Sequence, residues 1–362
     1  MAVKRIENAW WTLTAPLLGV ALAIAVFLSL FSANPPFIAL PLAMLLGTCV
    51  FAAVHHAEII AARTGEPYGS LVLALAVTVL EVGLILSLML SKADGGPTIA
   101  RDTVYSGIMI ITAGIIGFSL LVGSRRHFEQ SLRIRGTSSA LAVLIVLAVI
   151  TLVLPNYTVA TTGPTLSKLQ LVMVALTSLL LYCVFLFVQT VRHREYFLPE
   201  EELDDGQVIP VKRTVWISAL MLAAALFSVI MLAKALSPNL SAIITAAGLP
   251  SSFTGVVIAA LVLMPEGIAA VRAALANRLQ VSINLALGSG LATIGLTIPA
   301  VAIADLIGGF NIILGISPAQ TVLLLLALFV SAITLNNGRT NILFGAVHLS
   351  IFAMFLLISA VP

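Results

Sequence analysis

The feature that most constrains the fold is a series of long apolar runs separated by short polar segments. A hydrocarbon core about 30 Å thick is crossed by about 20 apolar residues in a helix, and this chain has eleven such runs. They cover residues 12–32, 37–62, 67–92, 103–123, 139–154, 168–191, 214–236, 251–274, 281–305, 318–335 and 341–360. The segment 239–248 is also apolar, and either extends the seventh run or follows a break at Pro238. The sequence therefore predicts an all-α polytopic membrane protein of about eleven transmembrane helices.

Composition excludes a water-soluble globule. Hydrophobic residues make up 60% of the 362 residues and charged residues 9%, against about 25% charged in soluble domains. The net charge of +3 does not indicate a nucleic-acid partner, because the cations lie at the ends of the apolar runs. We expect the lipid bilayer to be the main partner and no nucleic acid to bind. The sequence leaves the oligomeric state open.

The distribution of lysine and arginine predicts the orientation. If the N-terminus is cytoplasmic, 14 of the 18 cations fall on the cytoplasmic side. The four on the other side are Lys92, Arg101, Lys168 and Lys234. Cytoplasmic loops carry such an excess of positive charge, so we expect a cytoplasmic N-terminus and an external C-terminus.

The chain divides around its longest polar stretch, residues 192–213, which we expect to be a cytoplasmic acidic linker. The preceding segment 36–191 and the following segment 214–362 each hold five runs, and residues 1–35 form an extra N-terminal helix. The second run of each half carries a lone glutamate, in GSLVLALAVTVLEVG and TGVVIAALVLMPEGI. An odd number of helices per half gives the halves opposite orientations, so the sequence predicts a 5+5 inverted repeat. Such repeats are typical of secondary transporters.

The two glutamates, Glu81 and Glu266, carry the functional hypothesis. They lie fourteen and fifteen residues into their runs, near the expected bilayer midplane, where an ionisable side chain costs about 2.5–3.5 kcal/mol. The alternative is a protonated glutamate hydrogen-bonded to a neighbouring helix. Two facing carboxylates would hold a proton or a hard cation such as Ca²⁺. Competition between protons and the cation for one site would produce antiport.

Oxygen atoms near these acids are candidate ligands. Thr78 lies one turn before Glu81. Pro265 has no N–H to bond the backbone carbonyl of Leu261, which leaves that oxygen available. The ninth run adds Ser282, Asn284 and Ser289. Helix packing is the alternative explanation for both the proline and the small polar residues.

Two further clusters have a functional and a structural interpretation. His55, His56 and Glu58 form either a proton relay or gate, or a polar cluster at the membrane interface. The acidic run in the linker is either a solvated segment or a weak Ca²⁺ sensor. Its acids are Glu200, Glu201, Glu202, Asp204 and Asp205.

Two blocks resemble the calcium/proton exchangers of the cation antiporter superfamily, in particular the bacterial Cha-type branch. They read HHAEIIAARTGEPYGSLVLALAVTVLEV and VLMPEGIAAVRAALANRLQVSINLALGSGLATIGLTIP. The resemblance implies that Glu81 and Glu266 form one central cation and proton site. The family's Gly-Asn-Ala-x-Glu motif is incomplete, because Thr78 and Leu263 replace its two asparagines. Na⁺ and K⁺ therefore stand beside Ca²⁺ as candidate cargo.

The expected function is secondary active exchange of a cation for protons by alternating access. Ca²⁺ export is the first candidate, Na⁺/proton or K⁺/proton antiport the second, and a cation channel a more distant one. An enzyme is not expected, since H-E-x-x-H, paired intramembrane aspartates and a nucleophile elbow are missing from the sequence. We expect no cofactor beyond the transported Ca²⁺, Na⁺ or K⁺ and H⁺, and a place in the bacterial inner membrane.

Overall fold

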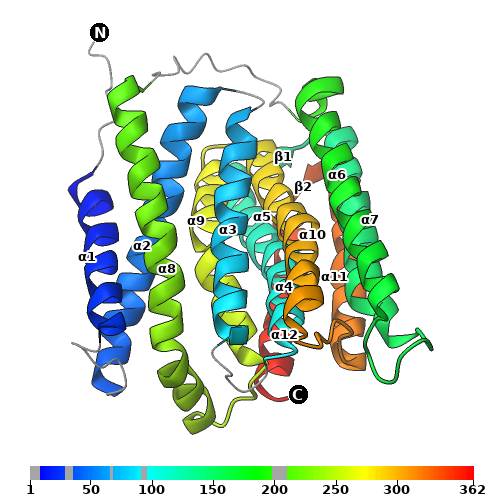
Figure 1. Ribbon diagram of the computed structural model, residues 1–362. Helices are drawn as coiled ribbons and strands as arrows, with labels where there is room; N and C mark the ends of the chain where they lie inside the picture. The colour runs from blue at the N-terminus through cyan, green and yellow to red at the C-terminus, as the bar shows by residue number, and fades with distance from the viewer. Residues whose placement is uncertain (1–8, 29–35, 66–67, 91–95, 198–209) are drawn as a thin grey trace. The chain divides into compact units, whose positions relative to one another are not determined.

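The computed structural model describes residues 9–28, 36–65, 68–90, 96–197 and 210–362, and these form eleven helices long and apolar enough to cross a membrane (Figure 1). The spans that are single α-helices are α1 (Trp10–Phe27), α2 (Pro36–Thr64), α3 (Tyr68–Leu90), α8 (Lys212–Ala246), α9 (Phe253–Leu275), α10 (Leu279–Gly308), α11 (Pro318–Leu335) and α12 (Ile342–Ala360). The predicted class, an all-α polytopic membrane protein, is confirmed. Spanning chains must satisfy their backbone groups internally, which is why the apolar runs become helices.

Three spans contain π-helical turns, which the sequence analysis did not predict. The fourth span is α4 (Ile99–Met109), η1 (Ile110–Ile115) and α5 (Ile116–His127). The fifth is α6 (Ile134–Ala148), η2 (Val149–Val153) and the 3₁₀ turn η3 (Leu154–Asn156). The sixth is α7 (Lys168–Phe187) and η4 (Val188–Arg192), followed by the 3₁₀ turn η5 (Arg194–Tyr196). Such turns free backbone carbonyls from the regular ladder.

The segment after Pro238 extends the seventh helix, because α8 continues through this proline to Ala246. Of the two readings of residues 239–248, extension is therefore correct. A two-stranded ribbon, β1 (Gln130–Ser131) and β2 (Arg339–Thr340), adds a feature that the sequence did not predict. It pairs two short loops in antiparallel register.

Polar residues at the starts of α7 and α11 fix where these helices begin. Ser167 and Gln170 form a capping box, in which the Ser167 side chain accepts from the Gln170 N–H and the Gln170 side chain accepts from the Ser167 N–H. Ser317 and Gln320 repeat this arrangement at α11. Both capping boxes provide hydrogen-bond acceptors for N–H groups that the start of a helix leaves without a partner.

The chain forms two compact units. Unit 1 comprises Met1–Gly96 and Leu203–Gly248, and unit 2 comprises Pro97–Glu202 and Leu249–Pro362. Unit 1 therefore contains α1, α2, α3 and α8, and unit 2 contains the other spans. Each unit combines helices from both predicted repeats.

Within unit 1, α1, α2 and α8 run side by side (Figure 1). Polar side chains fix α1 to both neighbours: Ser228 donates to the Pro16 carbonyl at 3.0 Å, and the Cys49 thiol donates to the Ala15 carbonyl at 3.4 Å. A Cβ at Gly19 would lie 2.6 Å from the Ser228 Cβ, so glycine is required for this approach. The extra N-terminal helix is thus an integral part of unit 1.

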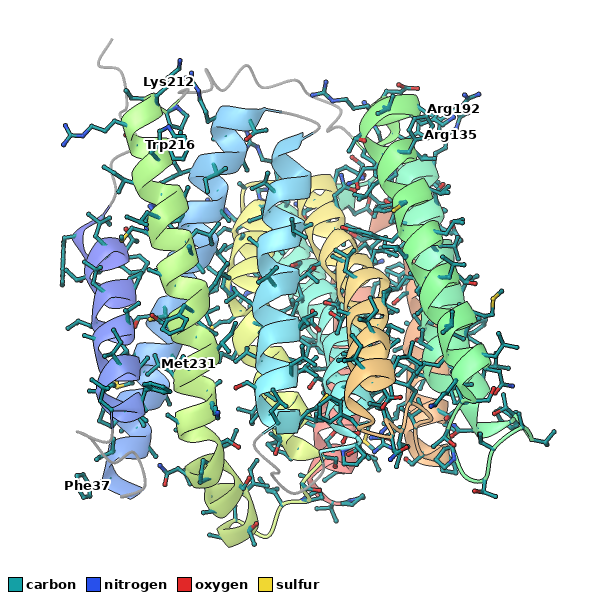
Figure 2. All side chains as sticks on the ribbon, viewed as in Figure 1. Phe37, Arg135, Arg192, Lys212, Trp216 and Met231 are labelled. Atoms are coloured by element: carbon teal, nitrogen blue, oxygen red, sulfur yellow. The ribbon has the colours of Figure 1, made fainter. Side chains whose placement is uncertain are left out.

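Labelled charged and apolar side chains mark the ends of helices in each unit (Figure 2). In unit 2, Arg135 and Arg192 lie at the same end of α6 and α7, and in unit 1 Lys212 and Phe37 lie at opposite ends of α8 and α2 (Figure 2). Phe37 and Trp216 are both 78% exposed. Large apolar side chains exposed on this scale are expected where lipid surrounds the helices.

Candidate functional site

Glu266 lies on α9 in unit 2, on a helix held by very close contacts. A Cβ at Gly255 would lie 2.5 Å from the backbone carbon of Asp102 on α4, and one at Gly267 would lie 3.3 Å from the Ile115 side chain of η1. Glu266 itself is 6% exposed. The glycines let α9 approach its neighbours closely, and so fix the depth of a buried carboxyl group.

The residue before this carboxyl is Pro265, and α9 continues through it as one helix. Proline supplies no N–H to the carbonyl four residues earlier, which belongs to Leu261. This oxygen lies one turn from Glu266 on the same helix. It remains a predicted ligand.

The hydroxyls predicted on α10 are present in unit 2, but its asparagine is engaged elsewhere. Ser282 is buried, and neither its hydroxyl nor that of Ser289 has a hydrogen-bond partner among the described residues. Asn284 accepts from Gln280 at 2.8 Å and donates to the Phe197 carbonyl at 2.5 Å. Asn284 therefore ties α10 to the segment after α7, and nothing in the structure favours it as a cation ligand.

Glu81 lies on α3 in unit 1 and is 4% exposed. A Cβ at Gly83 would lie 2.7 Å from the Ile230 side chain of α8, and Ser87 donates to the Ile230 carbonyl at 3.1 Å. Thr78, the predicted neighbouring ligand, donates to the Ala74 carbonyl at 2.8 Å. The hydroxyl oxygen of Thr78 keeps its lone pairs, so it can still accept or coordinate.

The predicted His55, His56 and Glu58 cluster does not share one environment. His56 is fully buried and its Nε2–H donates to the Thr12 carbonyl of α1 at 2.9 Å. Pro16 removes the helical partner of this carbonyl, so His56 satisfies a backbone group that α1 leaves open. Glu58 is exposed on α2. This favours the structural interpretation for His56, while the relay hypothesis stays a prediction.

His348 shows the same chemistry in unit 2. Its Nδ1–H donates to the Thr112 carbonyl in η1 at 2.7 Å, and its Nε2 accepts from the Thr334 hydroxyl at 3.1 Å. One buried imidazole therefore joins α12, η1 and α11. Each of these two histidines bonds a backbone carbonyl where a helix departs from the regular α-helical pattern. For His56 this role could have been inferred from the sequence, because Pro16 leaves the Thr12 carbonyl without its helical partner.

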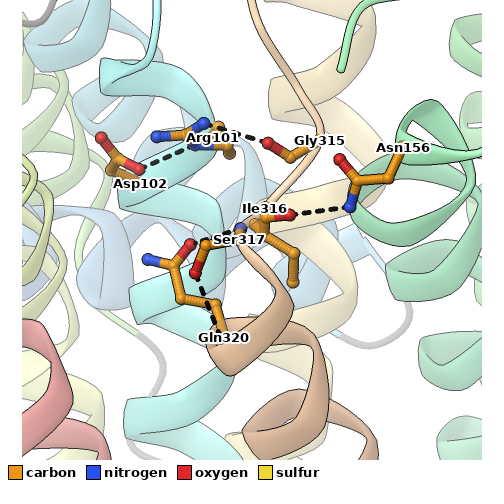
Figure 3. A network of polar contacts seen from close by, with 7 residues as sticks. All are labelled: Arg101, Asp102, Asn156, Gly315, Ile316, Ser317 and Gln320. Carbon is orange, nitrogen blue, oxygen red and sulfur yellow. Dashed lines mark hydrogen bonds and ion pairs between the residues drawn. The ribbon is translucent and has the colours of Figure 1, made fainter. Parts of the chain in front are cut away.

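A buried acid that the sequence analysis missed is Asp102 in the first turn of α4. It is 2% exposed and pairs with Arg101, whose Nε lies 2.8 Å from its Oδ1 (Figure 3). Arg101 also donates to the Gly315 carbonyl at 3.0 Å. Asp102 lies just before the apolar run predicted at 103–123 and beside Arg101, so no local pattern marks it as buried.

The acids of the linker lie outside the described residues. Glu200, Glu201, Glu202, Asp204 and Asp205 all fall in the segment 198–209. Their predicted role stays a prediction.

The profile of the family described as sodium/calcium exchanger protein matches the chain in two segments, residues 35–191 and 217–361. The segments correspond to the two predicted repeats, and each contains one of the two glutamates. The ionic transporter y4hA of Sinorhizobium fredii is 48% identical, over 100% of this chain and 99% of that protein. The sodium-potassium/proton antiporter ChaA of Escherichia coli is 39% identical over 89% of both proteins.

More distant similarities extend to calcium transporters. A Ca²⁺/H⁺ antiporter of Aphanothece halophytica is 26% identical, over 74% of this chain and 76% of that protein. The solved structure of native YfkE has a TM-score of 0.70 at 18% identity, over 97% of this chain and 100% of that chain. The H⁺/Ca²⁺ exchanger CAX also has a TM-score of 0.70 at 18% identity, over 96% and 87%. At this level of identity the two structures show a shared fold.

Proposed function

We propose that this chain, which belongs to the sodium/calcium exchanger protein family, is a secondary active cation/proton antiporter. The observation that carries the proposal is the pair of buried glutamates, one in each segment that the family profile matches. Glu81 belongs to unit 1 and Glu266 to unit 2. The resemblance to the exchangers implies that the two glutamates serve one central cation and proton site, as is typical of transporters built from inverted repeats.

In the proposed mechanism, protons and the cation compete for the two carboxylates. With a cation bound, both glutamates are ionised and their negative charge is neutralised by the cargo. When the cation has left, protons bind the carboxylates, which removes both the cost of burying their charges and their mutual repulsion. Because an unneutralised pair of carboxylates is costly in a low-dielectric core, only the loaded states change the exposed side. This rule couples the two fluxes.

We propose Ca²⁺ as the first candidate cargo, since two carboxylates match its charge and its preference for oxygen. The Thr78 hydroxyl, the Leu261 carbonyl, Ser282 and Ser289 are the proposed neutral ligands, and Asn284 is a weaker candidate because its amide is engaged. A specific observation favours Na⁺ or K⁺ as the second candidate. Thr78 and Leu263 stand where the resemblance predicts asparagines, and the relative ChaA is named a sodium-potassium/proton antiporter.

We place the protein in the bacterial inner membrane, with a cytoplasmic N-terminus and an external C-terminus. The lysine and arginine distribution supports this orientation. The proposal includes no cofactor other than the transported ions. It also leaves the role of the linker acids as a prediction of weak Ca²⁺ sensing.

The test uses wild-type protein reconstituted into vesicles that contain a pH dye. An imposed gradient of Ca²⁺, Na⁺ or K⁺ should drive proton movement in the opposite direction, and the ion that does so at the lowest concentration identifies the cargo. Cation flux without proton movement would contradict the proposal and favour a channel. Empty vesicles provide the background leak.

A further inference from the structure

The helices around Glu266 carry hydroxyl groups that have no assigned role in cation binding at that glutamate. Thr103 on α4 and Thr297 on α10 are both fully buried. Neither hydroxyl makes a hydrogen bond to any group in the part of the chain that the structure describes. Burying a hydroxyl without a partner is costly, so these two residues require an explanation.

Other buried threonines of unit 2 behave differently. Thr112, Thr137 and Thr151 each donate to the carbonyl one turn earlier in their own span, at 2.7, 3.0 and 2.6 Å. This is the usual fate of a threonine hydroxyl in a helix. Thr103 and Thr297 instead keep both their hydrogen and their lone pairs available for another partner.

The packing of α4 against α10 places these two threonines at the same level. A Cβ at Gly107 would lie 3.5 Å from the Thr293 side chain, and one at Gly290 would lie 3.3 Å from the Ile111 side chain, so the two segments are antiparallel and in register. Thr103 lies one turn before Gly107, and Thr297 lies one turn after Thr293. Residues four apart share a helix face, so both threonines belong to the faces that meet.

Glu266 lies at the inner end of the same interface. A Cβ at Gly107 would approach Leu263 of α9 at 3.8 Å, and Gly267 contacts η1 through Ile115. The carboxyl between these contacts is therefore level with the α10 turn that holds Ser289 and Thr293. Moving from Glu266 toward the start of α4, the faces that α4 and α10 turn toward each other carry Thr293 and then Thr103 with Thr297, and the buried Asp102 follows next to Thr103.

Asp102 on α4 is the last residue of this series and lies next to the start of α9. Its backbone contacts Gly255, which precedes Glu266 by eleven residues, or about 16 Å along the helix. The ion pair with Arg101 and the bond from Arg101 to Gly315 hold the acid at this end of unit 2 (Figure 3). The lysine and arginine distribution predicts that this end faces outside.

We propose that Asp102, Thr103, Thr297 and Thr293 form a proton route through unit 2 that connects Glu266 with the outer side. The inference rests on the proposed function. At each step a hydroxyl oxygen accepts a proton on a lone pair and releases its own hydrogen to the next acceptor, so no net charge or atom is left behind. Turns are 5.4 Å apart, a gap that one bridging water spans.

The route suits a proton better than the cargo. A metal cation needs several oxygen ligands, or room for its hydration shell, whereas this route offers one or two neutral hydroxyls at each turn. A hydroxyl, by contrast, is both donor and acceptor. The cation therefore reaches Glu266 by a different way.

The test separates proton-driven exchange from cation self-exchange, which moves labelled cation against unlabelled cation without protons. Thr103→Val and Thr297→Val preserve side-chain shape and remove the hydroxyl. Each should slow proton-driven uptake of radioactive Ca²⁺ or Na⁺ by about tenfold or more, as expected for a lost proton-transfer group, and leave self-exchange at the wild-type rate. Thr297→Ser should restore coupling, and Asp102→Asn should resemble the valine variants.

The matched control is Thr151→Val, a buried threonine of unit 2 that bonds its own helix, and both of its rates should stay near wild type. Self-exchange at the normal rate shows that a variant is folded. The inference would be overturned if Thr103→Val and Thr297→Val coupled protons at the wild-type rate, or if both kinds of exchange fell together. Failure of the wild-type protein to couple protons at all would instead overturn the proposed function.

Discussion

The two glutamate-bearing helices differ in what their own units provide around them. On α3 the hydroxyls nearest to Glu81 are engaged, because Thr78 bonds the Ala74 carbonyl and Ser87 bonds the Ile230 carbonyl. Around α9, the neighbouring helices α4 and α10 contribute the buried hydroxyls of Thr103 and Thr297, which have no partner among the described residues. The α3 hydroxyls of Thr78 and Ser87 thus donate to backbone carbonyls, whereas α4 and α10 provide hydroxyls that are available to pass protons.

The strongest way to break this comparison is to remove each carboxyl group in turn. Glu81→Gln and Glu266→Gln should each lower proton-coupled cation flux by at least about a hundredfold, since losing one member of a buried charged set costs about 3–5 kcal/mol. Vesicle flux measures the loss. Glu195→Gln is the control, because the Glu195 side chain is 67% exposed and belongs to no proposed ion or proton site. A glutamine variant of either buried glutamate that exchanges normally would make the shared site wrong.

A smaller effect is expected from the histidine of unit 2. His348→Leu leaves the Thr112 carbonyl and the Thr334 hydroxyl buried without their partner, which should lower the free energy of unfolding by about 1–3 kcal/mol. Thermal unfolding in detergent measures the change. His193→Leu is the control, since the His193 side chain is 39% exposed. Equal melting temperatures for His348→Leu and wild type would contradict the role of His348 as a clamp on η1.

The histidine of unit 1 distinguishes a structural clamp from a proton relay. His56→Leu removes one hydrogen bond to the Thr12 carbonyl, so we expect a loss of about 1–2 kcal/mol in unfolding free energy. The folded fraction should retain proton coupling. Melting temperature and flux per folded molecule are measured together. A stable variant that moves cation without protons would instead support the relay hypothesis for His55, His56 and Glu58.

The mildest change tests the predicted backbone ligand. Pro265→Ala restores an N–H that can bond the Leu261 carbonyl, and we expect cation affinity to fall by about fivefold, near 1 kcal/mol. Affinity is read from the cation concentration that half-saturates flux. Pro41→Ala is the control, because Pro41 is an exposed proline within α2. Unchanged affinity would remove Leu261 from the ligand set.

Much of the fold could be predicted from the sequence, because hydrophobic length alone fixes membrane spans. The two glutamates were also predictable, since a charge in the middle of an apolar run has few explanations. The π-helical turns were not, because an inserted residue leaves the apolar pattern intact. Packing between distant helices was equally hidden. The hydrogen bond from Asn284 to the Phe197 carbonyl and the register of α4 against α10 depend on contacts that no local pattern encodes.

The contrast between the helical defects shows where sequence reasoning could have gone further. Pro16 indicates from the sequence that the Thr12 carbonyl lacks its helical partner, and His56 on another helix is the buried donor that bonds it. No such sign precedes the Thr112 carbonyl, which is exposed to His348 because η1 is π-helical. Prolines inside predicted spans therefore identify backbone groups that need partners, whereas π-turns become visible only in the structure.

The most direct test of the central claim measures protons released when the cation binds. Purified protein in detergent and weak buffer, with a pH dye, receives Ca²⁺, Na⁺ or K⁺ in separate titrations. If protons and cation compete for Glu81 and Glu266, the wild-type protein should release protons on binding its cargo, and Glu81→Gln and Glu266→Gln should release fewer or none. Cation binding with no proton release, or equal release from the wild type and both variants, would contradict the account.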